Sequence, residues 1–326
     1  MQSIRFIISC AAAVACATGS VFAQEPVSAY PSRAIRLILP SEPGGGADIQ
    51  ARMFAQKISE NMSRQMLVEN RAGAAQEIGH IYVSKAAPDG YTVLMASPAF
   101  SFIPAMSKEP SYDPITQFAP VIQVSRSPYV LYVRQNLLVK SFAEYIAYAK
   151  ANPGALNIGA VGPGGFTHLA AAWLHNAIGV KVTYIPFKGT GPILTEVVAG
   201  RLDGAFGNPL SVLPIVKSGK ARLLAVSTAQ RARALPDLPT LAELGVAGYD
   251  LSTWQAIFVP AGTAGGIVNK LNAEFEKVLK SPGVAEKLSE DGSEAVGGSA
   301  EQLRQLVARE VARWGEIIPT IGLDRR

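Results

Sequence analysis

Short apolar runs alternate with amphipathic segments along most of the chain, and glycine-rich turns separate them. Residues 34–40, 66–69 and 91–96 are apolar runs with the length and composition of buried strands. Between the first two, residues 48–58 carry apolar side chains at helical spacing after Asp48, a residue type favoured at helix starts. This alternation predicts an α/β fold in which a mostly parallel sheet is flanked by helices.

The same alternation returns in a second unit, after a proline-rich stretch at residues 98–120 that we expect to be irregular. Extended segments are predicted at residues 121–124, 129–133, 157–161, 181–187, 202–206 and 221–227, and helices at 141–152, 167–177, 192–198 and 210–217. The chain crosses between units near residues 121–130 and again near 235–252. We therefore predict two lobes around a ligand cleft, residues 24–124 with 240–326 forming one and 125–239 the other.

Capping boxes mark two of the predicted helix starts. Ser141 and Glu144 have the spacing of such a box, and so do Ser299 and Gln302. The second box opens one of two amphipathic helices that are predicted to complete the chain, the other covering residues 267–280. Their apolar stripes are expected to face the core.

The first 23 residues have the pattern of a cleaved secretory signal. Arg5 supplies a positive charge before the apolar residues 6–17, and small residues precede a cleavage site after Ala23. An uncleaved membrane anchor or a lipid anchor at Cys10 or Cys16 is the alternative. With cleavage the mature chain has no cysteine, because both lie in the signal, and we expect an exported protein.

Composition and motifs argue against several functions. The net charge of +5 is spread along the chain without a basic run, so no nucleic acid is expected as a partner. Of the three histidines, His80, His168 and His175, the last two could share a helix face, but no acidic residue lies one turn from either and the mature chain offers no cysteine, so no metal site is predicted. No G-x-S-x-G, G-x-G-x-x-G or Walker motif is present, and neither catalytic residues nor a cofactor are expected.

Three glycine-rich turns follow predicted strands and precede predicted helices. They are residues 44–46, 162–165 and 189–191. Glycine lets backbone N–H groups approach an anion closely, and a helix N-terminus carries partial positive charge. Such turns lie at the carboxyl ends of strands, where α/β sheets bind ligands. Because the turns are divided between the two lobes, we predict an anion site in the cleft.

The sequence also resembles a known family over nearly all of the mature chain. The matching segments, in order, are residues 30–33 (YPSR), 43–48 (PGGGAD), 68–73 (VENRAG), 86–91 (AAPDGY), 112–114 (YDP), 118–120 (FAP), 149–154 (AKANPG), 167–170 (THLA), 186–189 (PFKG), 234–240 (ALPDLPT) and 260–263 (PAGT). They resemble the Bug-type solute-binding proteins, which are the periplasmic receptors of tripartite tricarboxylate transporters.

The resemblance implies a two-lobed periplasmic binding protein, similar to type II, that holds a small organic carboxylate. It implies location in the periplasm, a monomer, and transient contact with membrane transporter subunits. The loops at 41–48 and 162–168 resemble pincers that grip a carboxylate through backbone N–H groups. The implied ligand-binding residues are Ser41, Gly44, Gly45, Gly46, Ala47, Asp48, Ser97, Ala99, Gly162, Gly164, Gly165, Phe166, Thr167, His168, Thr190, Asn208 and Trp254.

Three departures from the family pattern bear on the ligand. Ser41 and Glu42 stand where Phe-Pro is common, and Phe166 offers an apolar wall after a glycine turn. Gly207 precedes Asn208 where many relatives have an aspartate, which removes a partner for an amino-acid ammonium group. These departures weaken the case for the usual dicarboxylates and tricarboxylates, so an aromatic acid or a monocarboxylate stands beside them as an alternative ligand.

Two other functions fit parts of the pattern. A sensory module that reports a solute to a membrane kinase would have the same cleft. An exported esterase would need a nucleophile and base, for which Thr167 beside His168 is the candidate pair. Adjacent residues on a helix point in different directions, which disfavours the esterase.

Overall fold

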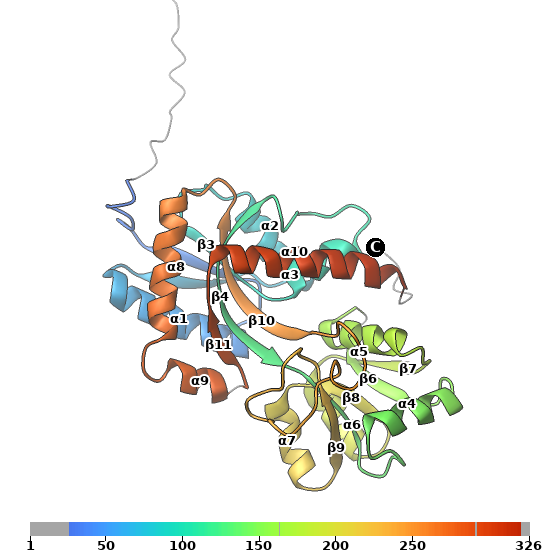
Figure 1. Ribbon diagram of the computed structural model, residues 1–326. Helices are drawn as coiled ribbons and strands as arrows, with labels where there is room; N and C mark the ends of the chain where they lie inside the picture. Colours follow the sequence, from blue (N-terminus) through green and yellow to red (C-terminus); the bar gives the residue numbers. More distant parts are fainter. Residues whose placement is uncertain (1–25, 163, 291, 321–326) are drawn as a thin grey trace, which may run out of the picture.

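A computed structural model describes residues 26–162, 164–290 and 292–320, and its strands form two separate sheets (Figure 1). The first sheet contains β1 (Ile35–Leu39), β2 (Met66–Asn70), β3 (Thr92–Ala96), β4 (Phe118–Pro128), β10 (Ser252–Pro260) and β11 (Glu294–Gly297), in the order β11-β4-β10-β3-β1-β2. The second contains β5 (Val130–Arg134), β6 (Asn157–Val161), β7 (Thr183–Phe187), β8 (Gly204–Gly207) and β9 (Ala221–Val226), in the order β7-β6-β8-β5-β9.

Helices connect and cover these strands. In the lobe of the first sheet they are α1 (Gly46–Met62), η1 (Ala74–Gln76), α2 (Glu77–Ser84), α3 (Ala99–Phe102), η2 (Pro104–Met106), α8 (Gly265–Leu279), α9 (Val284–Glu290), α10 (Ala300–Ile317) and η3 (Ile318–Thr320). In the lobe of the second sheet they are α4 (Phe142–Ala151), α5 (Phe166–Ala177), α6 (Thr190–Val198) and α7 (Pro209–Lys217). The result is the predicted α/β architecture with two lobes (Figure 1).

Both sheets are mixed, with a parallel part that the sequence predicted. β1 is parallel to β2 and β3, and β6 is parallel to β7 and β8. By contrast, β10 is antiparallel to β3 and β4, and β5 is antiparallel to β8 and β9. Helical crossovers fix the direction of the parallel strands. β5 and β10, each of which follows a crossing between the lobes, have no such crossover and run against them.

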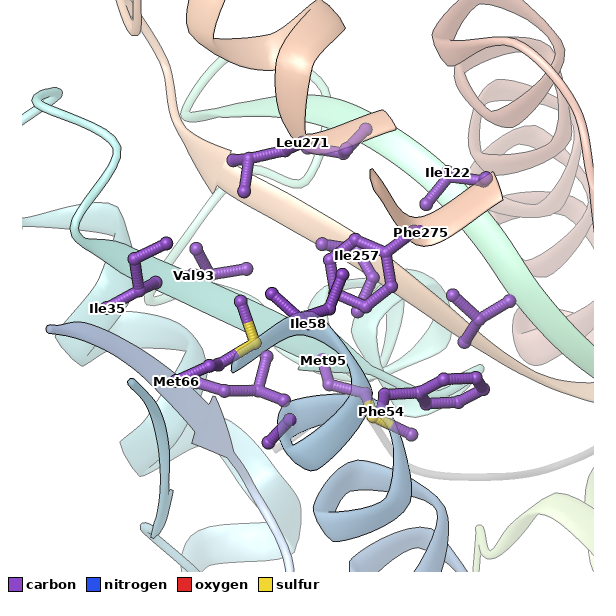
Figure 2. Packing of buried hydrophobic residues seen from close by; sticks show 14 of the residues in the cluster. Ile35, Phe54, Ile58, Met66, Val93, Met95, Ile122, Ile257, Leu271 and Phe275 are labelled. Atoms are coloured by element: carbon purple, nitrogen blue, oxygen red, sulfur yellow. The ribbon is translucent and has the colours of Figure 1, made fainter. Parts of the chain in front are cut away.

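The first sheet is buried on both faces. Leu37 and its neighbour Ile38 point to opposite faces, as successive residues in a strand do. Leu37 belongs to the cluster that includes Phe54 of α1 and Phe275 of α8, whose ring centroids are 6.1 Å apart (Figure 2). Ile38 faces the cluster covered by α2 and α10. The continuous apolar runs of β1 and β3 follow from this burial on both faces.

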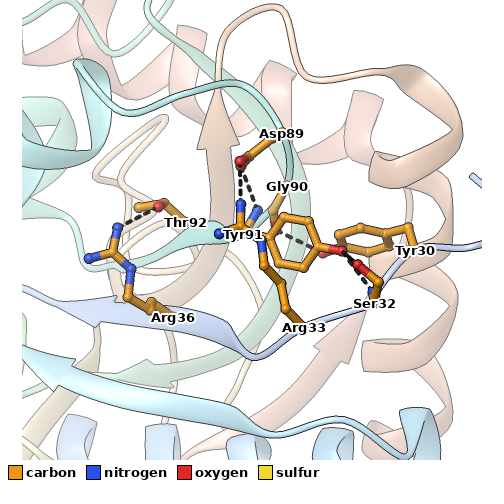
Figure 3. A network of polar contacts seen from close by, with 8 residues as sticks. All are labelled: Tyr30, Ser32, Arg33, Arg36, Asp89, Gly90, Tyr91 and Thr92. Carbon is orange, nitrogen blue, oxygen red and sulfur yellow. Dashed lines mark hydrogen bonds and ion pairs between the residues drawn. The ribbon is translucent and has the colours of Figure 1, made fainter. Parts of the chain in front are cut away.

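The first described residues are tied to the turn that precedes β3 (Figure 3). The Tyr30 hydroxyl donates to the Gly90 carbonyl at 2.7 Å, and the Arg33 guanidinium is 2.8 Å from the Asp89 carboxylate. Gly90 has φ +82, and an added Cβ would meet Ile267 and Tyr30, so this turn position requires glycine.

Two segments carry the chain between the lobes, and they are hydrogen-bonded to each other. The first is the β4–β5 junction at Tyr129, and the second leads from Ser227 after β9 to Leu251 before β10. The N–H group of Tyr129 donates to Ser227 Oγ at 2.9 Å, and the N–H group of Ser227 donates to the Tyr129 carbonyl at 2.9 Å. The N–H group of Leu251 donates to the Ser227 carbonyl at 2.8 Å. We call Tyr129, Ser227 and Leu251 the hinge contacts.

Some predicted local structure was wrong. The proline-rich stretch contains α3 and η2, because Pro98 and Pro104 stand at helix starts, where proline is tolerated. Near the chain end, α9 and β11 precede α10 and were not predicted. β11 is a short edge strand whose only described partner is β4. It is therefore defined by pairing with a strand distant in the sequence, which a local pattern does not reveal.

The capping-box predictions had different outcomes. Ser299 and Gln302 form the complete reciprocal pair at the start of α10. At α4 the N–H group of Glu144 donates to Ser141 Oγ, but the Glu144 carboxylate accepts from the N–H group of Lys140. The predicted signal, with Cys10 and Cys16, lies outside the described residues. Within the described part of the chain, no helix combines the length and apolar character that a membrane crossing needs.

Candidate functional site

A cavity of about 680 Å³ lies between the lobes, within the range of ~300–1,000 Å³ that is typical of ligand pockets. Residues at the carboxyl ends of β1 and β3, with η1 and the start of α2, line it from one lobe, and the turn after β6 lines it from the other. Tyr129 and the β10 residues Thr253 and Gln255 line it beside the hinge contacts. Its position at the carboxyl ends of parallel strands is the one expected for a ligand site.

Eight of the predicted site residues meet at this cavity. Ser41, Ala47, Ser97 and Ala99 line it from the first lobe, and Gly162, Gly164, Gly165 and Phe166 line it from the second. The two predicted pincer turns therefore face the same space. Their role in ligand binding stays a prediction.

The first pincer turn leaves backbone N–H groups at the start of α1 without helical acceptors. The N–H groups of Asp48 and Ile49 both donate to the Gly45 carbonyl, at 2.9 Å and 3.0 Å. The N–H groups of Gly46 and Ala47 precede these bonds, as the first donors of a helix do. Together with the helix dipole they form an electropositive end next to the cavity.

Asp48 holds this turn in shape and does not line the cavity. Gly45 occupies the cap position, so the prediction that Asp48 caps the helix was wrong. The Asp48 carboxylate, inside the first helical turn, accepts from the N–H group of Gly44 at 3.0 Å and from Arg52 Nε at 2.9 Å. The Arg52 hydrogen bond is the main cause that lowers the pKa of Asp48 to about 2. The carboxylate is therefore ionised and paired, and Asn70 donates to its other oxygen.

The second pincer turn uses Thr167 and His168 as internal braces. The N–H group of Val161 donates to Thr167 Oγ1 at 2.8 Å, and that of Gly164 donates to His168 Nδ1 at 3.0 Å. Burial lowers the pKa of His168, and the Nδ1 bond requires the neutral tautomer with hydrogen on Nε2. Thr167 and His168 thus face different partners within this described turn. The first helical bond of α5 is from Leu169 to Gly165, so the backbone N–H groups of residues 166–168 precede it.

The remaining predicted residues lie elsewhere. Asn208 and Trp254 line a smaller pocket of about 190 Å³ with Gly46, and this pocket shares Ala47, Thr253 and Gln255 with the main cavity. Asn208 donates to Ser127 Oγ at 2.9 Å, which connects the second lobe to β4. Thr190 is exposed and lines neither space, and it starts α6, two residues before the predicted helix start.

Several polar lining residues were not predicted: Gln76, Glu77, Ser107, Ser111, Thr253 and Gln255. Ser97 Oγ donates to Gln76 Oε1 at 2.8 Å, and Ser111 Oγ donates to Glu77 Oε1 at 2.9 Å. In β10, Thr253 and Gln255 alternate with buried Trp254, a polar face that the sequence carries but that looked like part of an apolar run. No signal in the sequence places Gln76 and Glu77 at the cavity, because they follow Ala74 and Ala75, whose left-handed backbone conformation the residue type does not predict.

One lining hydroxyl points to ligand contact. Ser41 Oγ is buried and has no hydrogen-bond partner among the described residues, which is costly unless another group satisfies it. Burial raises the pKa of Tyr129 to about 12, so its hydroxyl keeps its proton and can donate. Over the described ranges, no three His, Cys, Asp or Glu residues are grouped to hold a metal ion. The hydrogen-bond donors that line the cavity are therefore neutral groups.

Two α/β lobes around a ligand-sized cavity define the class of two-lobed solute-binding proteins. Residues 50–323 match the family model described as "Tripartite tricarboxylate transporter family receptor". The protein BugT from Bordetella pertussis is 32% identical over 308 residues, which cover 94% of each chain. The chain belongs to the tripartite tricarboxylate transporter receptor family, as the sequence resemblance indicated.

Solved structures of relatives have the same fold. A Rhodopseudomonas palustris protein with adipate is 35% identical with a TM-score of 0.74, and the match covers 90% of this chain and 98% of that one. MatC from Rhodopseudomonas palustris, with bound malate, is 28% identical with a TM-score of 0.72, covering 89% of this chain and all of that one. Both relatives thus carry small carboxylates in their structures.

Proposed function

We propose that this chain is a receptor that captures a small organic carboxylate in the 680 Å³ cavity between its lobes. The observation that carries the proposal is the meeting of two helix N-termini, at Gly46 and Phe166, with backbone donors that precede the first helical bonds. Helix N-termini bind carboxylates through such donors. Relatives with adipate and malate support the ligand class.

Delivery of the ligand to a tripartite tricarboxylate-type membrane transporter is the second part of the proposal, and it rests on the family. We propose that residues 1–23 direct export to the periplasm, where the mature chain acts as a monomer. We also propose lobe boundaries at residues 24–124 with 240–326 and at 125–239. Uptake of a bound carboxylate by cells should fall when the chain is removed and return when it is restored.

Binding can be tested by calorimetry and thermal unfolding with adipate, malate, citrate and benzoate. A ligand at 100 times its Kd adds about 2.7 kcal/mol to the free energy of unfolding. No stabilisation and no heat with any of these carboxylates would count against the receptor function.

The role of the first helix N-terminus has a matched pair of variants. Gly46→Pro removes one N–H group, and proline suits this first helical position because Gly45 before it is extended, with φ −80 and ψ 169. Gly46→Ala keeps the N–H group and serves as the control. Loss of one hydrogen bond to a charged ligand is expected to weaken binding about tenfold or more in the proline variant alone. Equal affinities in the two variants would remove this N–H group from the site.

A further inference from the structure

We propose that the cavity selects a carboxylate with a single negative charge and a ring-sized apolar body, and that Glu77 discriminates against a second carboxylate. This inference rests on the proposed receptor function and names the ligand class of the same cavity. The proposed ligand class differs from adipate and malate, the dicarboxylates in the structures of the two relatives. Three features of the cavity carry it: an aromatic wall, a charge distribution and a polar end.

The aromatic wall joins both lobes. Phe102 of α3 and Phe166 of α5 have ring centroids 6.3 Å apart and an angle of 24° between ring planes. Tyr129 at the hinge is 5.5 Å from Phe166, with its ring tilted by 53°. All three rings line the cavity, and Ile103 and Met106 extend the apolar surface. A ligand ring placed against this wall would bury apolar surface that a short dicarboxylate does not have.

The charge distribution disfavours a second carboxylate. Among the described residues, no lysine, arginine or histidine lines the cavity, and Glu77 is the single acidic residue in its lining. Two helix N-termini provide the donors for one carboxylate. The described lining contains no cationic side chain that would neutralise the charge of a second carboxylate. A second carboxylate would share a space of limited size with Glu77, and like charges in a partly desolvated site repel.

The polar end of the cavity fits one carboxylate group. Ser41, whose buried hydroxyl lacks a described partner, lies at the turn that precedes α1. Gln255 and Thr253 line the same cavity and the smaller pocket, and Ala47 at the α1 N-terminus is shared by both spaces. None of the described residues that line the smaller pocket has a charged side chain. The carboxylate would therefore meet neutral donors at this end, while its apolar body reaches the aromatic wall.

Calorimetry with four probes tests the selection: benzoate, 4-hydroxybenzoate, terephthalate and adipate. Terephthalate differs from benzoate by one carboxylate on the same ring. We expect benzoate and 4-hydroxybenzoate to bind about tenfold or more tightly than terephthalate and adipate. The same titrations on variants then identify which side chain is responsible.

Glu77→Gln keeps the shape and an acceptor for Ser111, and removes the negative charge. It is expected to tighten terephthalate binding about tenfold and to change benzoate binding less than twofold. Glu109→Gln makes the same charge change at an exposed residue outside the lining and should alter neither ligand. Phe166→Leu keeps apolar volume without the ring and should weaken benzoate about fivefold. Thermal unfolding of each variant checks that it is folded.

The outcomes separate the inference from the receptor function. If terephthalate and adipate bind as tightly as benzoate and Glu77→Gln leaves the ratio unchanged, the selection is overturned and the receptor function remains. If none of the four probes produces heat or stabilisation, the proposed function fails, and the inference fails with it. Preference for benzoate that disappears in Glu77→Gln, but not in Glu109→Gln, supports the selection as stated.

Discussion

Glu310 of α10 is a buried carboxyl group between two neutral hydrogen-bond partners. Trp254 Nε1 donates to one oxygen at 3.1 Å, and the other oxygen is 2.6 Å from Ser101 Oγ. Ser101 Oγ is also 2.9 Å from the Pro98 carbonyl, and a hydroxyl has one proton for these two acceptors. A protonated Glu310 that donates to Ser101 satisfies both contacts. Burial is the main cause that raises the pKa of Glu310 to about 7.

This carboxyl group should make stability depend on pH. Between its ordinary pKa of 4.5 and about 7, the folded chain holds a proton that the unfolded chain has lost. The contribution of Glu310 is therefore complete below pH 4.5 and falls as the pH rises to about 7. Glu310→Gln mimics the protonated form and should gain on the order of 2 kcal/mol over wild type between pH 5 and pH 7.5. Urea unfolding at both pH values measures this gain in the free energy of unfolding. The same pH dependence of stability in wild type and Glu310→Gln would contradict the prediction.

His80 of α2 is a second buried polar side chain, and it lacks partners. Neither ring nitrogen has a hydrogen-bond partner within the described residues, and burial lowers the pKa of His80 to about 3. The rings of Phe100 and Tyr112 lie 5.3 Å and 5.0 Å away. Unsatisfied polar groups in such surroundings cost free energy, so the native structure holds the imidazole at a penalty.

His80→Leu is therefore expected to stabilise the chain by about 1–2 kcal/mol. The gain should increase as the pH falls below 6.5, because the unfolded wild-type imidazole then binds a proton that the folded one does not. His175→Leu is the matched contrast, since the two His175 nitrogens lie 2.7 Å and 2.9 Å from the Tyr145 and Tyr184 hydroxyls. It should destabilise. Thermal unfolding measures the change in stability of each variant. A gain for His80→Leu with a loss for His175→Leu supports the argument, and changes of the same sign contradict it.

At the scale of elements, the segment before α2 has an unusual backbone. Ala74, Ala75 and Gln76 have φ values of 45°, 54° and 85°, a left-handed region that costs L-residues about 1–2 kcal/mol each. All three line the cavity. Strained backbone at a ligand site is held by its surroundings, and here the Ser97–Gln76 hydrogen bond contributes.

Ala75→Gly should relieve this strain and raise the free energy of unfolding by about 0.5–1 kcal/mol. Ala147→Gly makes the same chemical change at an exposed position inside α4, where it should cost about 1 kcal/mol. Differential scanning calorimetry compares the two directly. Destabilisation by both variants would mean that surrounding contacts, and not strain, dominate at Ala75.

Local patterns predicted the elements whose apolar spacing is regular. β6 has the predicted bounds, and α1, α5 and α8 begin within two residues of their predicted starts. β11 has no apolar pattern, and α9 is short, so both depend on packing that sequence spacing does not encode. The antiparallel direction of β5 and β10 was missed for the same reason, because it follows from how the chain crosses between lobes.

The lining of the cavity was predictable in part from glycine turns between strand and helix. The turns at 44–46 and 162–165 lie in loops that line the cavity, whereas none of residues 189–191 lines it. Side-chain roles were less accessible. The side chains of Thr167 and His168 accept hydrogen bonds from the backbone of their own turn. Glu77 lines the cavity after a left-handed backbone segment that the residue types there do not predict.

At the scale of the molecule, α10 connects the two lobes in addition to the hinge contacts (Figure 1). Leu303 and Val307 near its start pack in the first lobe, in the cluster with Ile38. Trp314 near its end is fully buried in the cluster of the second lobe. Its ring lies 6.1 Å from Phe102 at the cavity wall, so α10 joins the lobe contact to the ligand site.

Trp314→Ala should uncouple the lobes. It removes ring contacts with Phe102 and with Trp173 of α5, 6.2 Å away, and should cost about 3–5 kcal/mol. Because α10 no longer holds the second lobe, one calorimetric unfolding transition should broaden or divide into two. Trp314→Phe keeps an apolar ring but removes part of the indole together with an Nε1 that has no described partner, so it should cost about 1–2 kcal/mol, less than Trp314→Ala, with one transition. A single sharp transition in Trp314→Ala would show that the hinge contacts couple the lobes without α10.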